Sequence, residues 1–409
     1  MDRGKGAERA DSAEGGDVGK HRPEGERRLQ HAAEIMGEFA DETGLTSGRP
    51  ARRYLWTDAL GVCTSLGLHE ETGDDRWRRL ALDLVDQVHR VLGRHRPDDP
   101  REGWISGLDE EEGGRRPTAG GLRIGKEAPE RGPSEPYRPR EEWDRDGQYY
   151  HYLTRWAHAL NRTWRVTGDR RYQRWAVELM QGGHGGFVLG GDPGNGGGGP
   201  RGRRSVAWKM SIDLSRPLVP TEGEHDPLDG LVTVRTLRAT SPEDGDVLEA
   251  EERELAEMCR GRHWVTDDGL GLGGLLALAW WTAWLGDRGG GDPELLEILL
   301  RDAAAGLSEF ERAAELDAPA GWRLAFRELG LATGLSAAER LVAAAGEGGE
   351  VSVPAGPADS LRDYLPLRRE IEEFWLREEH RKASTWREHR DISRVALATS
   401  LAPGGYLDL

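Results

Sequence analysis

Apolar residues recur along most of this chain at intervals of three and four, which is the spacing of one face of an α-helix. Segment 27–40 is an example, because Leu29, Met36 and Phe39 share one face. The same pattern predicts helices at 54–66, on both sides of 167–169, and at 226–239, 247–259, 272–285, 293–307, 322–332, 337–345, 359–380 and 388–401. Strand signals are few and lie between the helices. The pattern therefore predicts an all-α protein.

Two of the predicted turns share one sequence pattern. Segments 72–77 and 167–172 both read Thr-Gly-Asp-x-Arg-aromatic, and each lies between two helical segments. Glycine at a helix end adopts the left-handed capping conformation, and the aspartate after it can cap the next helix. A related turn is predicted at 333–336, with Gly334 ending one helix and Ser336 capping the next. These turns predict a repeated antiparallel helical hairpin.

The lengths of the connections predict how the hairpins are arranged. Turns within a hairpin are short, whereas the links between hairpins are long, and the longest are 94–145 and 183–225. If the helices alternate in direction, all long links lie on one face. The helices that begin near 54, 147, 226, 271, 322 and 359 then present their N-termini there, with unpaired N–H groups and partial positive charge. Six such helices predict the inner ring of an (α/α)6 toroid.

The predicted domain organisation is simple. Residues 1–26 are polar and lack a hydrophobic segment, so we expect a disordered tail and no signal peptide. Residues 27–409 are predicted to form a single barrel with the two long links as insertions. One predicted helix is left over beyond the twelve that the barrel needs.

Composition limits the partners that this chain can bind. The formal net charge is −17, which argues against nucleic acid and against an anionic membrane surface. No apolar run reaches the length of a membrane span. The two cysteines, Cys63 and Cys259, cannot form a disulfide framework, so we expect a reducing, cytoplasmic location. Neither metal-binding nor nucleotide-binding motifs are convincing, and no cofactor is expected. The oligomeric state stays open.

Aromatic and acidic residues gather at the predicted open face. They occur at 56–58 (Trp-Thr-Asp), at 143–151 and at 225–229 (His-Asp-Pro-Leu-Asp). Together with the hairpins and the Thr-Gly-Asp turns, these clusters resemble the (α/α)6 barrels of the six-hairpin glycosidase superfamily over about residues 27–401. The N-acylglucosamine 2-epimerase-like sugar isomerases share that barrel. The resemblance implies a carbohydrate-active enzyme acting on a small-molecule carbohydrate, most simply a glycoside hydrolase.

Hydrolytic members of this superfamily are expected to use two carboxyl groups, one as acid and one as base or nucleophile. The candidates at the predicted mouth are Asp58, Asp144, Asp146, Asp226 and Asp229. An aspartate at a helix start is often only an N-cap, and for Asp58 and Asp226 both interpretations stay open. Asp146 has aromatic neighbours in the sequence, which can raise the pKa of a carboxyl group.

Histidines support a second hypothesis. His151 lies one turn inside an inner helix, and His225 stands at the entrance of another. A pair of imidazoles suits proton abstraction and return at a sugar carbon, which is the chemistry of an epimerase or isomerase. His151 can equally be a hydrogen-bonded core residue. His389 is set aside, because the predicted helix directions place it at the short-turn end.

Substrate-binding candidates are aromatic or basic. Sugars stack on aromatic rings, and cations can bind a carboxylate or phosphate, although solvated loop charges are an equal alternative for the cations. The candidates are Trp56, Trp104, Trp143, Tyr149, Tyr150, Gln148, Arg123, Lys126, Trp208 and Lys209. A third hypothesis is a sugar-binding barrel without catalysis.

Overall fold

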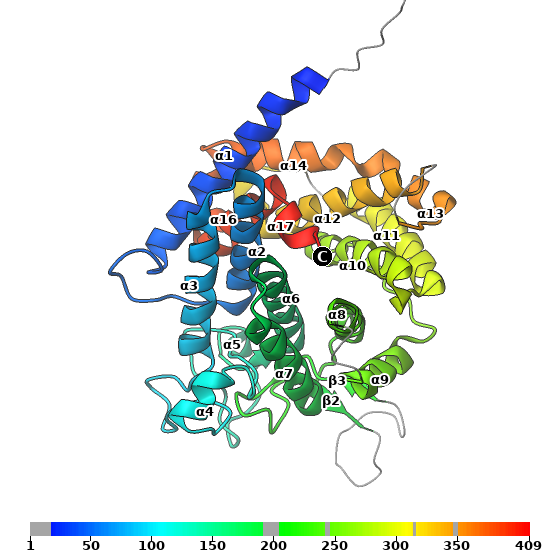
Figure 1. Ribbon diagram of the computed structural model, residues 1–409. Helices are drawn as coiled ribbons and strands as arrows, with labels where there is room; N and C mark the ends of the chain where they lie inside the picture. Colours follow the sequence, from blue (N-terminus) through cyan, green and yellow to red (C-terminus); the bar gives the residue numbers. More distant parts are fainter. Residues whose placement is uncertain (1–17, 191–203, 242–245, 314–315, 347–350) are drawn as a thin grey trace, which may run out of the picture.

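The computed structural model describes residues 18–190, 204–241, 246–313, 316–346 and 351–409 (Figure 1). Twelve of the described helices form two concentric rings. The inner ring contains α2 (Leu55–Thr72), α6 (Tyr150–Thr167), α8 (Asp226–Thr240), α10 (Gly269–Leu285), α12 (Ala325–Ala344) and α16 (Arg390–Leu401). The outer ring contains α1 (Val18–Glu42), α3 (Asp75–Leu92), α7 (Arg170–Phe187), α9 (Glu249–Cys259), α11 (Pro293–Ala313) and α14 (Pro366–Leu376).

The inner ring is closed. Each inner helix contacts the next one in chain order, and α16 returns to contact α2. Each outer helix packs on an inner one: α3 on α2, α7 on α6, α9 on α8, α11 on α10, α14 on α12 and α1 on α16. The predicted all-α (α/α)6 toroid is therefore confirmed. Within the described ranges, no helix combines the length and apolarity that crossing a bilayer requires.

The two Thr-Gly-Asp turns have the predicted geometry. Gly73 and Gly168 end α2 and α6 with φ values of 69° and 74°, in the left-handed region. Asp74 and Asp169 then accept hydrogen bonds from backbone N–H groups two residues on, at 2.9 Å in each case. Each turn thus ends an inner helix and caps the outer helix that follows.

The predicted turn at 333–336 is wrong, because α12 runs through it without a break. Gly334 lies inside this helix, where it faces Gly273 of α10. A Cβ atom added to Gly334 would lie 2.4 Å from the Cα of Gly273. The glycine therefore serves a close approach of two inner helices rather than a helix end.

This correction changes the last part of the barrel. Two predicted helices merge into α12, which removes the surplus helix and reverses the directions expected after it. The sixth inner helix is consequently α16, which begins at Arg390, and not a helix that begins near 359. The predicted helix at 359–380 is instead divided among α13 (Ala355–Asp359), a short 3-10 turn and α14, and α15 (Ser384–Glu388) precedes α16.

The long links lie at the N-terminal ends of the inner helices, as predicted. They carry α4 (Glu110–Arg115), α5 (Pro139–Glu142) and two small antiparallel pairings. Strand β1 (Gln148–Tyr149) pairs with β4 (Lys209–Met210), and β2 (Val188–Leu189) pairs with β3 (Ser205–Val206). The first pairing joins the two long links to each other at the mouth of the barrel.

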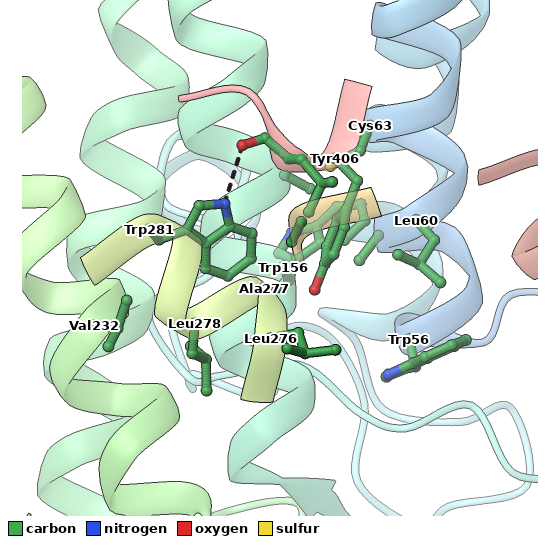
Figure 2. Close-up of a cluster of buried hydrophobic side chains, with 14 of the residues drawn as sticks. Trp56, Leu60, Cys63, Trp156, Val232, Leu276, Ala277, Leu278, Trp281 and Tyr406 are labelled. Atoms are coloured by element: carbon green, nitrogen blue, oxygen red, sulfur yellow. Dashed lines mark hydrogen bonds between the residues drawn. The ribbon is translucent and has the colours of Figure 1, made fainter. Parts of the chain in front are cut away.

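Both termini differ from a simple barrel. Helix α1 begins at Val18, so residues 18–26 of the expected tail are helical, while residues 1–17 lie outside the described residues. At the other end of the chain, α17 (Gly404–Leu407) turns into the barrel interior (Figure 1). Its Tyr406 joins a buried cluster that includes Trp281 of α10 and Leu60 and Cys63 of α2 (Figure 2).

Candidate active site at the barrel mouth

A cavity of about 1060 Å³ opens at the N-terminal ends of the inner helices. All six inner helices line it, each with residues from its N-terminal half. Examples in ring order are Trp56, Arg155, Asp229, Gly274, Thr333 and Ile392. The size matches pockets that hold small-molecule ligands. The structure thus places a cavity on the face that the sequence predicted.

A histidine and an aspartate from neighbouring inner helices meet in this cavity. The Nδ1 atom of His151, in the first turn of α6, lies 3.2 Å from Oδ1 of Asp226, the first residue of α8. Burial raises the pKa of Asp226, and the nearby His151 opposes that rise. The second oxygen, Oδ2, has no hydrogen-bond partner among the described residues. One carboxylate oxygen is therefore buried in the cavity wall without a hydrogen-bond partner in the described part of the chain.

A second ion pair lies one helical turn deeper. Asp229 Oδ1 is 2.9 Å from a guanidinium nitrogen of Arg155, which is one turn beyond His151 on α6. The guanidinium also lies 5.9 Å from the ring centre of Trp281. Its Nη1 atom is buried and has no hydrogen-bond partner within the described ranges. Arg155 thus brings a positive charge to the cavity wall.

Two further imidazoles line the cavity, from opposite sides of the ring. His225 precedes α8 and His389 precedes α16, and two inner helices separate α8 from α16 in either direction around the ring. Their rings pack against Trp264 at 5.8 Å and Phe326 at 5.2 Å. In the described part of the chain neither imidazole has a hydrogen bond or ion pair. Both are available for proton transfer.

The rim is aromatic and carries one lysine. Trp143 and Trp208, from the two long links, pack edge to face with ring centres 5.1 Å apart, and both line the cavity. Trp143 is 55% exposed. Lys126 also lines the cavity, with its amine 5.5 Å from the ring centre of Tyr54. These side chains offer stacking surfaces and a cation to a ligand at the entrance.

Three of the predicted carboxylates lie outside the cavity lining. Asp58 is buried beside Arg53 at 3.4 Å and accepts a hydrogen bond from the backbone of Tyr54 at 2.8 Å, so it caps α2. Burial raises its pKa to about 6. Asp146 is also buried, where it pairs with Arg123 and fixes the loop at 125–126 through backbone N–H groups. Asp144 is exposed on the surface.

Most of the remaining substrate-binding candidates hold the long links together. Gln148 bonds to the backbone of Leu122, Gly120 and Ile212. Lys209 is buried against Glu142 at 3.0 Å. Arg123 bonds to Asp146 and two backbone carbonyls. Trp104, Tyr149 and Tyr150 are buried and do not line the cavity. Tyr149 does support the rim, since its ring lies 5.4 Å from that of Trp208.

Several lining residues were missing from the sequence-based candidates. His389 was misplaced because the false turn at 333–336 reversed the direction of α16. Arg155 and Tyr152 lie on α6, the inner helix that was predicted to begin near 147, and the one-turn spacing from His151 was the available signal for Arg155. Tyr406 gave no signal beyond an aromatic residue near the C-terminus. Across the described residues, no group of three or more His, Cys, Asp or Glu side chains is placed to hold a metal ion.

The chain is similar in structure to two kinds of carbohydrate-active enzyme. An inactive variant of the α-1,6-mannanase of Salegentibacter sp. HEL1_6, in complex with α-1,6-mannotriose, is 13% identical, with a TM-score of 0.52 over 92% of this chain and 99% of that one. A sugar epimerase from a ruminal bacterium is 10% identical, with a TM-score of 0.53 over 92% and 98%.

No protein-family model matches this chain, and neither does any curated protein. At these low identities the structural similarity shows the fold. It confirms the resemblance to six-hairpin glycosidase barrels as a likeness of architecture.

Proposed function

We propose that this protein is a carbohydrate-active enzyme that epimerises or isomerises a free sugar by proton transfer between two histidines. The observation that carries the proposal is the placement of His225 and His389 at the starts of two opposite inner helices, where both line one cavity and neither imidazole has a hydrogen bond or ion pair in the described residues. Imidazole has a pKa near neutrality, which suits a group that both takes and returns a proton.

The proposed reaction acts on the open-chain form of the sugar, at the carbon beside its carbonyl group. One imidazole removes the proton from that carbon, and the electron pair of the broken C–H bond forms the double bond of an enediolate. The other imidazole returns a proton to the opposite face, which inverts the carbon. The guanidinium of Arg155 is close enough to the cavity to stabilise the developing negative charge.

A hydrolase is the second candidate, and one observation favours it. Asp226 is buried in the cavity wall, its pKa is raised by burial, and one of its oxygens has no partner in the described residues. These are the properties of a general acid. Asp391 of α16 lines the opposite side of the cavity and would supply the second carboxylate, although it lies 3.2 Å from Arg52.

Incubation with sugars in D₂O distinguishes these proposals. The panel contains D-glucose, D-mannose, N-acetyl-D-glucosamine, cellobiose and α-1,6-mannotriose, with products followed by NMR. Proton transfer at carbon places solvent deuterium on the sugar, whereas hydrolysis produces new reducing ends without it. Binding without either product would indicate a non-catalytic sugar-binding barrel, and the absence of binding and product would overturn the carbohydrate assignment.

Histidine variants then test the assignment of residues. His225→Asn and His389→Asn are each expected to lower deuterium exchange by about 100-fold or more. His31→Asn is the control, because His31 is exposed on α1 and outside the cavity. Unchanged exchange in either cavity variant would remove that histidine from the proposed mechanism.

A further inference from the structure

The C-terminal segment closes the end of the barrel that lies opposite the mouth. Gly405 fits against α2, where a Cβ atom on Gly67 would lie 2.5 Å from the Cα of Gly405. On α6, Arg162 donates a hydrogen bond to the carbonyl of Gly405 at 3.1 Å, and a ring nitrogen of His158 lies 2.9 Å from the carbonyl of Tyr406. These contacts hold α17 between two inner helices.

The contacts on the other side of the barrel fix the same segment. The indole N–H groups of Trp280 and Trp281, on α10, both donate to the carbonyl of Leu407, at 3.1 and 3.2 Å. Arg340 of α12 pairs with Asp408. Apart from His158, in the middle of α6, these partners lie in the C-terminal halves of their helices, whereas most of the helical cavity lining comes from the N-terminal halves. We call residues 404–408 the C-terminal plug.

One side chain of the C-terminal plug extends into the cavity from below. Tyr406 lines the cavity together with Leu60 and Leu278. Its ring lies edge-on against Trp281 (Figure 2) and against His158, which is stacked on Trp281, and both ring centres are 5.3 Å from that of Tyr406. Within the described residues, its hydroxyl group makes no hydrogen bond.

The hydroxyl group of Tyr406 can form hydrogen bonds with a sugar hydroxyl in the cavity. Burial raises the pKa of Tyr406 to about 12, and the guanidinium of Arg155 opposes that rise. The phenol therefore stays protonated near neutral pH and can both donate and accept a hydrogen bond. A nearly buried polar group without a hydrogen-bond partner is energetically unfavourable unless a ligand or water molecule pairs with it.

We propose that Tyr406 is a ligand-contacting residue and that its hydroxyl group binds a sugar hydroxyl at the closed end of the cavity. The inference rests on the carbohydrate function proposed above. It assigns a role in binding to a residue of the short helix α17, which lies outside the two rings. A purely structural role would need only the aromatic ring, which packs on Trp281 and His158.

Tyr406→Phe separates these two roles, because it removes the hydroxyl group and keeps the ring. Binding is measured by titration calorimetry with the five sugars of the panel. For each sugar that binds, the variant is expected to bind about 3- to 10-fold more weakly, as for the loss of one neutral hydrogen bond, with an unchanged melting temperature. Tyr172→Phe is the matched control, since Tyr172 is a buried tyrosine of outer helix α7, away from the cavity.

Monodeoxy derivatives of the sugar that binds best identify the hydroxyl that Tyr406 contacts. One derivative is expected to lose affinity for the wild-type protein but to bind Tyr406→Phe as well as the parent sugar does. Equal affinities of Tyr406→Phe and wild-type protein for every bound sugar would overturn the inference and leave the proposed function intact. If no sugar binds the wild-type protein, the proposed function fails and the role of Tyr406 fails with it.

Discussion

His151 and Asp226 contact each other across the first turns of two inner helices, with 3.2 Å between Nδ1 and Oδ1. The contact leaves Oδ2 of Asp226 unpaired among the described residues, in a wall where burial raises the pKa of the carboxyl group. A carboxylate held in this way lowers the stability of the fold, because ionisation is disfavoured there. Such a residue is typical of a functional site rather than of a structural one.

Replacement of Asp226 by Asn should therefore separate stability from function. Asn has the same shape without the charge, so we expect the free energy of unfolding at pH 7 to stay unchanged or to rise by about 1 kcal/mol. The pKa of Asp226 is raised in the folded protein, so ionisation of this carboxyl group lowers the stability of the wild-type protein. The higher stability of Asp226→Asn should therefore appear as pH rises through that pKa and vanish at low pH, where the wild-type carboxyl group is protonated. Under the hydrolase candidate, in which Asp226 is the general acid, turnover should fall by about 100-fold or more.

Asp58→Asn is the matched control for this prediction. Burial also raises the pKa of Asp58, to about 6, but this residue caps α2 outside the cavity lining. Because Asp58 pairs with the buried Arg53, Asp58→Asn is expected to lower the free energy of unfolding at pH 7 but to leave turnover unchanged. Denaturant unfolding at several pH values and rate measurements on both variants provide the comparison. Equal losses of turnover in the two variants would contradict the distinction between them.

A second prediction concerns the contact between α10 and α12. Gly334→Ala would place a Cβ atom 2.4 Å from the Cα of Gly273, so one of the two helices must move. We expect the free energy of unfolding to fall by about 1–3 kcal/mol, as for an overpacked core.

Gly37→Ala on α1 is the control, because nothing lies within 4 Å of its added Cβ. Alanine there should stabilise the protein by about 0.5–1 kcal/mol. Denaturant unfolding of both variants checks these values, and a stable Gly334→Ala would disprove the packing argument.

Gly334 also shows where prediction from the sequence reached its limit. A glycine that ends a helix and one that allows two helices to approach closely leave the same local pattern. At Gly73 and Gly168 the predicted aspartate caps form, whereas the cap predicted at Ser336 does not, since its hydroxyl group donates to the carbonyl of Ala332 within α12. At Gly334 the deciding partner was Gly273, which is distant in the sequence. One wrong turn was enough to reverse the last inner helix and to hide His389.

Part of the candidate site could be predicted from the directions of the helices. The alternation of short turns and long links placed Asp226, Asp229 and His225 at the mouth, and the cavity contains all three. The pattern could not separate residues that face the cavity from residues that anchor the links. Asp146 and Lys209 have the composition of a site, but their partners, Arg123 and Glu142, are revealed only by tertiary structure.

Asp146 supplies the third prediction. Asp146→Asn removes the charge that pairs with Arg123 and leaves a buried guanidinium group without its carboxylate. Breaking a buried ion pair from one side typically costs about 3–5 kcal/mol, so we expect a loss of stability of that order. The protein that remains folded at low temperature should keep most of its turnover. Thermal unfolding and rate measurements at about 10 °C test this, and a stable but inactive variant would return Asp146 to the catalytic candidates.

The last prediction concerns acid stability and His89 of α3. Burial lowers the pKa of His89 to about 3, and its Nε2 atom accepts a hydrogen bond from the indole of Trp156 at 3.1 Å. An unfolded chain takes up a proton on this histidine below pH 6.5, whereas the folded protein does not until about pH 3. Stability is therefore lost as pH falls through this window, by about 1.4 kcal/mol per pH unit for each such histidine.

His89→Gln should reduce the loss between pH 6.5 and 5 by about 2 kcal/mol, measured by denaturant unfolding. His31→Gln, on the exposed face of α1, should leave the loss unchanged, and equal losses in His89→Gln and wild-type protein would show that His89 does not titrate in this way.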